Sequence, residues 1–230
     1  MKHERRAHCF PSPARELGAI VSVDTYKPSV ARAAIAAGAV IVNDTSGLRD
    51  PRLAEVCAET GAALVIMHTL APPGRRLRDP ERYGDIAAEV LAFLRERIAA
   101  AIAAGVEREQ LIIDPGPDFA KTPAQTAQLL VQLRRLHELQ RPLLLAISRK
   151  DFIGALTARA PRARGAGTLA ALAHGVERGA SVFRVHDVAA AADFLAVRAA
   201  LRGDVEPSRD LVLSEELRHD SARGASSPKR

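Results

Sequence analysis

Residues 61–68 read GAALVIMH and contain the pattern that decides the fold class. A glycine, which can end a helix in a left-handed conformation, precedes an unbroken apolar run, and a polar side chain follows the run. Continuous apolar character is typical of strands buried on both faces, as in parallel sheets covered by helices. Six such runs occur, at residues 19–23, 39–42, 63–67, 111–113, 143–147 and 181–185, with longer alanine-rich stretches between them. The sequence therefore predicts an α/β fold.

The expected helix boundaries agree with this pattern. An N-cap residue precedes proline at Asp50-Pro51, Asp79-Pro80 and Thr122-Pro123. Glycines that suit a left-handed helix end stand before strands at Gly38, Gly61, Gly105 and Gly179. We expect one long helix over residues 80–104.

The composition limits the class of protein. Of 230 residues, 47% are hydrophobic, which is enough for a well-buried core and excludes disorder for most of the chain. No apolar run approaches the roughly 18 residues that a membrane span needs, so no membrane partner is expected. The basic N-terminus lacks the apolar core of a signal peptide. Cys9 and Cys57 form neither a metal motif nor a disulfide framework, so a cytoplasmic protein is expected.

The net charge of +6 is spread thinly along the chain. No block of like charge is interleaved with aromatic residues, of which there are only 6 Phe and 2 Tyr. This distribution argues against a nucleic-acid partner and favours a small anionic substrate.

Three segments are expected. Residues 1–18 are predicted to be irregular, because Pro11 and Pro13 discourage a helix. Residues 19–202 contain the six runs and form the predicted domain. Residues 203–230 are charged and small, and we expect this tail to be disordered.

Polar residues follow each of the six strands. They are Asp24, Asn43, His68, Asp114, Ser148 with Lys150, and Arg184 with His186. Strand-to-helix loops of parallel α/β folds open on one side of the sheet, so these side chains should converge on one cleft. Helix capping favours Ser, Thr, Asp and Asn, and does not explain the lysine, the arginine and the histidine.

The strand-end residues divide by chemistry. Carboxylate and amide oxygens of Asp24, Asn43 and Asp114 suit a flat heterocycle that presents N–H donors. Lys150, Arg184 and His186 supply positive charge and donors for a phosphate-type group. The apolar residues available as walls are Met67, Phe119 and Ile147. The cleft is predicted to bind a polar heteroaromatic that carries an anion.

Read with their neighbours, these strand ends resemble the dihydropteroate synthase family. The matching motifs are SVDTYKP at 22–28, VNDTSG at 42–47, Met67-His68, Asp114-Pro115-Gly116 with Phe119 and Lys121-Thr122, Ser148-Arg149-Lys150, and RVHDV at 184–188. The resemblance implies a (β/α)₈ barrel of TIM-barrel type. It also implies a transferase of folate biosynthesis that joins 6-hydroxymethyl-7,8-dihydropterin diphosphate to 4-aminobenzoate and releases pyrophosphate.

The resemblance further implies roles for individual residues. Lys150, Arg184 and His186 would be catalytic, the last two at the leaving diphosphate. The substrate-binding residues would be Asp24, Asn43, Met67, Asp114, Phe119, Ser148, Lys150 and Asp151. Mg²⁺ would be the cofactor, and a homodimer is possible.

Two departures from the family pattern bear on these expectations. A strand whose asparagine helps to bind magnesium normally precedes the first run, and no such strand lies before residue 19, so no metal ligand is assigned. Six units where a closed barrel needs eight predict an incomplete barrel with two open edges, expected to be unstable alone. The true start upstream, a partner chain that fills the gap, and a remnant all stay open.

The second departure concerns two carboxylates. Asp118-Phe119-Ala120 replaces the usual Gly-Phe-Gly, and Asp151 stands where the family commonly has a serine that contacts the aminobenzoate carboxylate. Two nearby carboxylates repel unless one is protonated or pairs with a cation.

Alternative interpretations accompany the main one. A truncated pterin-binding homologue without turnover would fit the departures, and a folate-dependent methyl-transfer domain fits the cationic motifs less well. His68 is either a core histidine or a wall of the site. Arg149 is interpreted as structural, paired with Asp187 or another carboxylate, and Arg162 and Arg164 as solvated loop charges.

Overall fold

The computed structural model describes residues 18–75, 77–214 and 217, and it separates the chain into two units, residues 1–187 and 188–230. Most of the predicted irregular start and part of the predicted tail lie outside the described residues, so the three segment boundaries stay predictions. The second unit contains one described helix, α8 (Val188–Arg202). The strands and the candidate site belong to the first unit.

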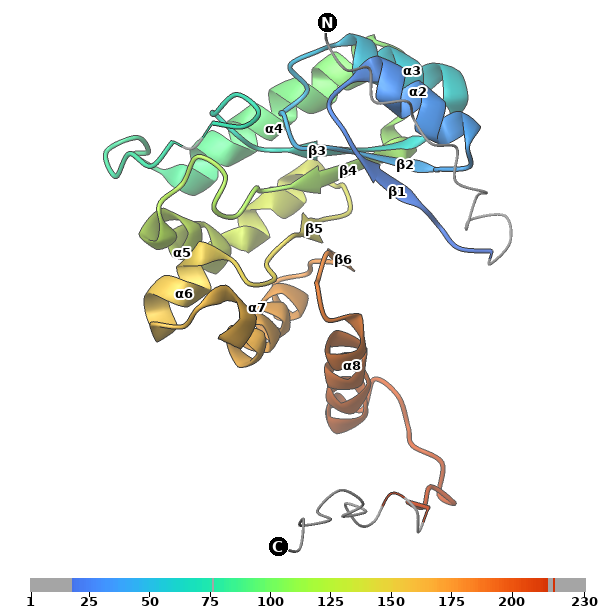
Figure 1. The fold of residues 1–230 in the computed structure, drawn as a ribbon, viewed down its shortest axis with the longest axis vertical. Coiled ribbons are helices and arrows are strands. Elements are labelled where there is room, and N and C mark those ends of the chain that lie inside the picture. The colour runs from blue at the N-terminus through green and yellow to red at the C-terminus, as the bar shows by residue number, and fades with distance from the viewer. Residues whose placement is uncertain (1–17, 76, 215–216, 218–230) are drawn as a thin grey trace, which may run out of the picture. The chain divides into compact units, whose positions relative to one another are not determined.

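Strands and helices alternate through the first unit, as expected for an α/β fold (Figure 1). The strands are β1 (Ser22–Asp24), β2 (Ile41–Asp44), β3 (Ala63–Met67), β4 (Leu111–Asp114), β5 (Leu144–Leu145) and β6 (Val182–Phe183). The α-helices are α2 (Pro28–Ala36), α3 (Arg52–Thr60), α4 (Ile86–Ala103), α5 (Pro123–Val131), α6 (Asp151–Thr157) and α7 (Gly165–Glu177). Short 3-10 turns are η1 (Arg108–Gln110), η2 (Leu133–Leu139) and η3 (Pro161–Ala163).

The strands run parallel and follow chain order. β1 to β4 form a four-stranded sheet, β5 and β6 form a pair, and a parallel bridge between Ile113 and Leu143 joins the two. This arrangement is the partial (β/α)-barrel type predicted from the sequence. Within the described part of the chain, β1 pairs with β2 alone and β6 with β5 alone.

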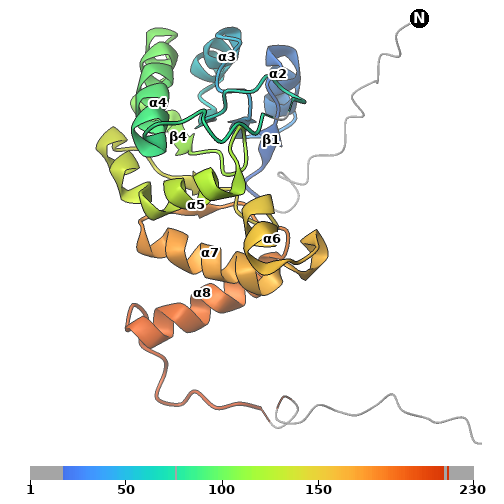
Figure 2. The same ribbon diagram turned by 90° about the vertical axis from the view of Figure 1, so that its left-hand side faces the viewer.

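Strand register decides which side chains become neighbours at the site. Asp24 lies opposite Asn43, and Met67 lies opposite Asp114. The carboxyl ends of all four strands therefore meet at one edge of the sheet, as parallel pairing requires. Helices α2, α3 and α4 stand beside one another along the sheet (Figures 1 and 2).

The core lies between the sheet and these helices. Residues Leu64 to Met67 of β3 are all buried, which explains the unbroken apolar run. Helix α4 presents an apolar stripe at intervals of about four residues, through Ile86, Val90, Leu94 and Ile98, all buried. The core is aliphatic because aromatic residues are few.

The helix ends were predicted well. Gly38, Gly61, Gly105 and Gly179 all have positive φ angles. Thr122 caps α5, where its hydroxyl accepts from the Gln125 N–H while the Gln125 side chain bonds back to the Thr122 N–H.

One helix boundary was wrong. The helix expected from residue 80 begins at Ile86, and Asp85 caps it by accepting from the Ala88 N–H. Asp79 instead caps a turn, because its carboxylate accepts from the Glu81 N–H. In the described residues, no helix is long and apolar enough to cross a membrane.

Candidate active site

Asp114, the last residue of β4, is the buried centre of the candidate site. Its side chain is 2% exposed and accepts from the Gly116 N–H at 2.8 Å. Burial raises its pKa to about 6, although the Gly116 N–H and the nearby charges of Lys150, Lys121 and Arg184 oppose the rise. A carboxyl group of this kind is ready to bind a ligand that offers N–H donors or a positive charge.

Asp24 and Asn43 extend the row of oxygens from Asp114. The Asn43 amide nitrogen donates to Asp24 Oδ2 at 3.4 Å, and an Arg184 guanidinium nitrogen lies 3.4 Å from the same oxygen. Asn43 is 7% exposed, and its Oδ1 has no hydrogen-bond partner among the described residues. A buried acceptor without a donor is costly, so this oxygen is a position where a bound molecule would supply an N–H.

Lys121 was missed as a site residue. It is 1% exposed, and its ammonium contacts His68 Nδ1 at 2.8 Å while it donates to the carbonyl oxygens of Gly116 at 2.9 Å and Phe119 at 3.0 Å. Burial lowers its pKa to about 7, with Asp114 opposing the fall. Lys121 thus ties the loop after β3 to the loop after β4.

His68 is a buried histidine that faces Lys121 rather than open solvent. Burial is the main cause that lowers its pKa to about 2, and the Lys121 charge adds to it. Its ring packs edge-on against Phe93 with centroids 4.8 Å apart. The structure therefore places His68 in the core, beneath the site.

Lys150 stands at the beginning of α6 and faces Phe119. Its ammonium lies 4.3 Å from the centroid of the Phe119 ring, within cation–π range. Burial lowers the pKa of Lys150, while Asp114 and Asp118 oppose that change. Phe119 and Lys150 therefore place an aromatic ring and a cation on the same side of the site.

Ser148 and His186 form a pair at the ends of β5 and β6. Ser148 Oγ accepts from the His186 backbone N–H at 3.2 Å and lies 2.8 Å from His186 Nδ1. Ser148 is buried. Its hydroxyl therefore orients His186.

The two carboxylates that sequence reasoning expected to repel are separately compensated. Asp118 accepts from the Thr126 hydroxyl at 3.1 Å and from the Asp151 backbone N–H at 2.5 Å. Asp151 pairs with Arg78 at 2.5 Å and with Arg164 at 3.3 Å. Each carboxylate thus has its own hydrogen-bond or ion-pair partners.

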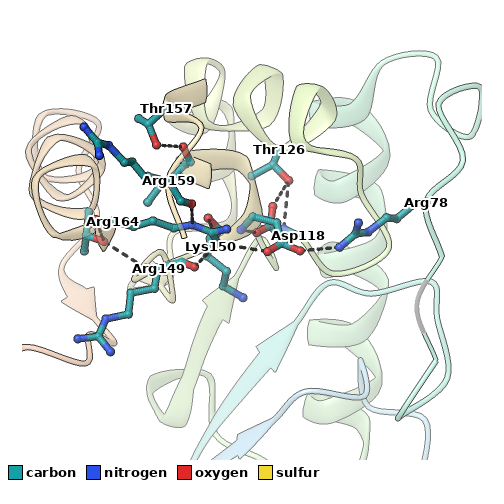
Figure 3. Close-up of polar contacts among 11 residues, drawn as sticks. Arg78, Asp118, Thr126, Arg149, Lys150, Thr157, Arg159 and Arg164 are labelled. Atoms are coloured by element: carbon teal, nitrogen blue, oxygen red, sulfur yellow. Dashed lines mark hydrogen bonds and ion pairs between the residues drawn. The ribbon is translucent and has the colours of Figure 1, made fainter. Parts of the chain in front are cut away.

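Arg164 is a correction to the sequence analysis. Its side chain is only 11% exposed, and it donates to the backbone carbonyl oxygens of Arg149, Lys150 and Arg159 (Figure 3). A guanidinium has enough donors to hold three carbonyls and a carboxylate at once. Arg162 is exposed, as expected, and Arg149 forms no ion pair within the described part of the chain.

A pocket of about 380 Å³ opens beside Lys150. Its lining consists of Gly74, Arg75, Leu77, Arg78, Asp118, Phe119, Ala120, Arg149, Lys150 and Asp151. Asp24, Asn43, Asp114 and Arg184 do not line this pocket. The candidate site therefore has two parts, a row of oxygens at the ends of β1, β2 and β4, and a cationic pocket at the start of α6.

The remaining predicted residues flank these parts. Met67 and Ile147 are buried, and Met67 packs against Gly116, where an added Cβ would lie 3.3 Å from Met67 Cγ. In the described residues no three His, Cys, Asp or Glu side chains are grouped as a metal site would require. By themselves, the described residues do not fit a Mg²⁺ site.

Known proteins resemble this chain in sequence. Residues 11–186 match the family described as pterin binding enzyme. Dihydropteroate synthase of Bacillus subtilis is 41% identical over 175 residues, which cover 76% of this chain and 59% of that protein. The inactive dihydropteroate synthase 2 of Mycobacterium tuberculosis is 40% identical over 194 residues, which cover 83% of this chain and 61% of that protein.

A solved structure of a dihydropteroate synthase is also similar to this chain. Dihydropteroate synthase of Xanthomonas albilineans in complex with 7,8-dihydropteroate superposes with a TM-score of 0.75 and 44% identity, over 82% of this chain and 69% of that one. The chain spans about three fifths of the length of the curated relatives named above. With a matched family over most of its length and a shared fold, this chain belongs to the pterin-binding, dihydropteroate synthase family.

Proposed function

We propose that this chain binds a pterin at the ends of β1, β2 and β4 and takes part in the synthesis of dihydropteroate. The single observation that carries this proposal is the row of acceptors at the strand ends, in which Asp114 and Asn43 are buried and Asp24 is exposed. A pterin ring presents an amino group and ring N–H groups along one edge, which complement such a row. The unpartnered Asn43 Oδ1 supports the proposal, because a ring N–H would satisfy it.

The proposed reaction is a displacement at the pterin methylene. The bond between the methylene carbon and the diphosphate oxygen breaks, and pyrophosphate leaves with the bonding electrons. The amine nitrogen of 4-aminobenzoate then bonds to that carbon and loses a proton. Positive charge at the methylene would be stabilised by the carboxylates of Asp24 and Asp114.

The cations of the site would act on the departing group. Arg184 lies next to Asp24 at the mouth, and His186 is oriented by Ser148, so both are placed to donate to diphosphate oxygens. Lys150, packed on Phe119, would lie between the pterin and the amine. From the family, the proposal also includes magnesium as a cofactor, a location in the cytoplasm and assembly as a homodimer.

The test measures pyrophosphate release from pterin diphosphate and 4-aminobenzoate in buffer with magnesium. We expect Lys150→Ala to lower kcat/KM at least tenfold, which corresponds to about 1.4 kcal/mol of lost transition-state stabilisation. Arg95→Ala is the matched control, because Arg95 is exposed on α4 and its one ion pair among the described residues is with Glu138. Equal rates for Lys150→Ala and the wild type would contradict the proposal.

The similarity to an inactive synthase favours one alternative, a pterin-binding protein without turnover. That alternative predicts pterin binding in calorimetry and no pyrophosphate release at saturating substrates. Absence of pterin binding by folded protein would refute both functions.

A further inference from the structure

The pocket beside Lys150 carries more positive than negative charge. One of its carboxylates, that of Asp151, already forms ion pairs with arginines. Arg75, Arg78, Arg149 and Lys150 line it, against Asp118 and Asp151. An excess of cations attracts an anionic ligand. Whether a ligand can use those cations depends on which of them are already paired.

Asp151 engages two arginines with its two oxygens. Oδ2 lies 2.5 Å from the Arg78 guanidinium, and Oδ1 lies 3.3 Å from that of Arg164. Arg78 comes from the loop between β3 and α4, whereas Arg164 precedes α7. In Figure 3, the labelled side chains of Arg78 and Arg164 point toward each other from opposite sides of the close-up. A carboxylate of the protein itself thus occupies the position between them.

The position of Asp151 is fixed from several directions. Its backbone N–H donates to Asp118, and the Thr126 hydroxyl holds Asp118 in turn. Arg164 also bonds to the Lys150 carbonyl oxygen at 3.1 Å, so the start of α6 is fixed at the same point. Arg78 is the more exposed of the two arginines, at 48% against 11% for Arg164.

We propose that Asp151 is a specificity-determining residue that acts as an internal carboxylate. It neutralises Arg78 and so lowers the preference of the pocket for an arylamine with a carboxylate over a neutral arylamine of similar shape. This inference rests on the proposed function in one respect, the use of this pocket for the amine. An incoming carboxylate must displace Asp151 from Arg78 or lie beside a like charge, and either cost offsets the new ion pair.

The test compares two ligands by calorimetry, 4-aminobenzoate and its neutral ethyl ester, on the full chain. For the wild type we expect dissociation constants within about threefold of each other. For Asp151→Asn, which keeps the size of the side chain but removes its charge, we expect 4-aminobenzoate to bind at least tenfold more tightly than to the wild type. The affinity for the ester should change by less than threefold.

Two further variants separate the specific pairing from general charge. Asp118→Asn removes one charge from the same pocket, but Asp118 pairs with Thr126 and the Asp151 N–H rather than with an arginine, so its effect should stay below threefold. Adding Arg78→Met to Asp151→Asn should abolish the gain, because Arg78 is the released guanidinium that lines the pocket, whereas Arg164 does not line it. Equal gains for Asp151→Asn and Asp118→Asn would overturn the inference.

Failure of this inference can be told apart from failure of the proposed function. Binding of 6-hydroxymethylpterin to the same samples is the readout for the proposed function, and it should be unchanged in Asp151→Asn. If pterin binds but Asp151→Asn does not change the preference between the two arylamines, only the inference is wrong. If the preference changes but pterin does not bind, only the proposed function is wrong. No binding of either arylamine to any folded variant would also overturn the inference.

Discussion

Replacing Asp114 with asparagine should stabilise the fold at neutral pH while it weakens ligand binding. Asp114 is 2% exposed, and burial raises its pKa from 3.8 to about 6. In the unfolded chain the carboxyl loses its proton near pH 4, whereas in the folded chain it keeps the proton until about pH 6. Between these values the folded state binds more protons, so its stability falls as the pH rises.

The size of this effect follows from the pKa difference. A pKa difference of about two units corresponds to a destabilisation of the folded state by about 3 kcal/mol. This destabilisation reaches its full size above pH 6 and vanishes below pH 4. Asparagine has no charge and can still accept from the Gly116 N–H. The pKa of about 6 already includes the attraction to Lys150, Lys121 and Arg184, so this attraction is not subtracted again. We therefore expect Asp114→Asn to be more stable than the wild type by about 1–3 kcal/mol at pH 7.5.

Urea unfolding at pH 4.5, 6 and 7.5 measures this difference, since the effects of other carboxyl groups cancel between the two proteins. The stability gain of Asp114→Asn should grow with pH across this range. Calorimetry with 6-hydroxymethylpterin should show at least a tenfold loss of affinity. A stability difference that is constant between pH 4.5 and 7.5 would refute the assigned burial of an ionised carboxylate at this position.

The remaining predictions concern the loop after β4. Gly116→Ala should destabilise the fold by more than about 2 kcal/mol in urea unfolding, because Gly116 has a φ of +64° and an added Cβ would lie within 2.1 Å of the His68 carbonyl oxygen. Gly61→Ala, with a φ of +72° and no atom within 4 Å of the added Cβ, is the control and should cost about 1 kcal/mol; equal costs would argue against the close approach. Lys121→Met tests the buried lysine, whose pKa falls from 10.5 to about 7 on folding. Above pH 7 the unfolded chain binds the extra proton, so the wild type should gain stability over Lys121→Met from pH 7 to 9, and a flat difference would show that the ammonium is not buried.

The sequence predicted the row of strand-end residues because parallel pairing leaves little freedom. Once residues 22–24 and 41–44 are parallel strands, Asp24 and Asn43 end at the same edge, and the register places them opposite each other. The same argument places Asp114 opposite Met67. These positions depend on the backbone, so apolar runs and their ends were enough to find them.

The contacts of the cationic pocket depend on tertiary packing that local sequence does not contain. Arg162 and Arg164 lie two residues apart in an arginine-rich loop, yet only the second turns inward to three backbone carbonyls. Asp79 and Asp85 are both aspartates near the expected start of a helix. The apolar stripe of α4 begins only at Ile86, a signal that could have located the true start.

Lys121 was missed for a related reason, since a lysine before a helix cap is normally a solvated residue. Its burial depends on three acceptors brought together from two loops, the carbonyls of Gly116 and Phe119 and the ring of His68. The Gly116 carbonyl faces it because residue 116 adopts a left-handed conformation that glycine tolerates. A motif search treats these three residues separately, whereas in the structure all three contact the same Lys121 ammonium.

The two parts of the site are therefore held by different means. The oxygens of Asp24, Asn43 and Asp114 are placed by strand register, which a single side-chain change leaves intact. Lys150 is placed through carbonyl contacts to Arg164, and Asp151 through its two arginines. Substitutions at the start of α6 should therefore leave the acceptor row intact, and under the proposed function they would change only the choice of the amine. If the proposed function holds, pterin binding and amine selection can for this reason change independently.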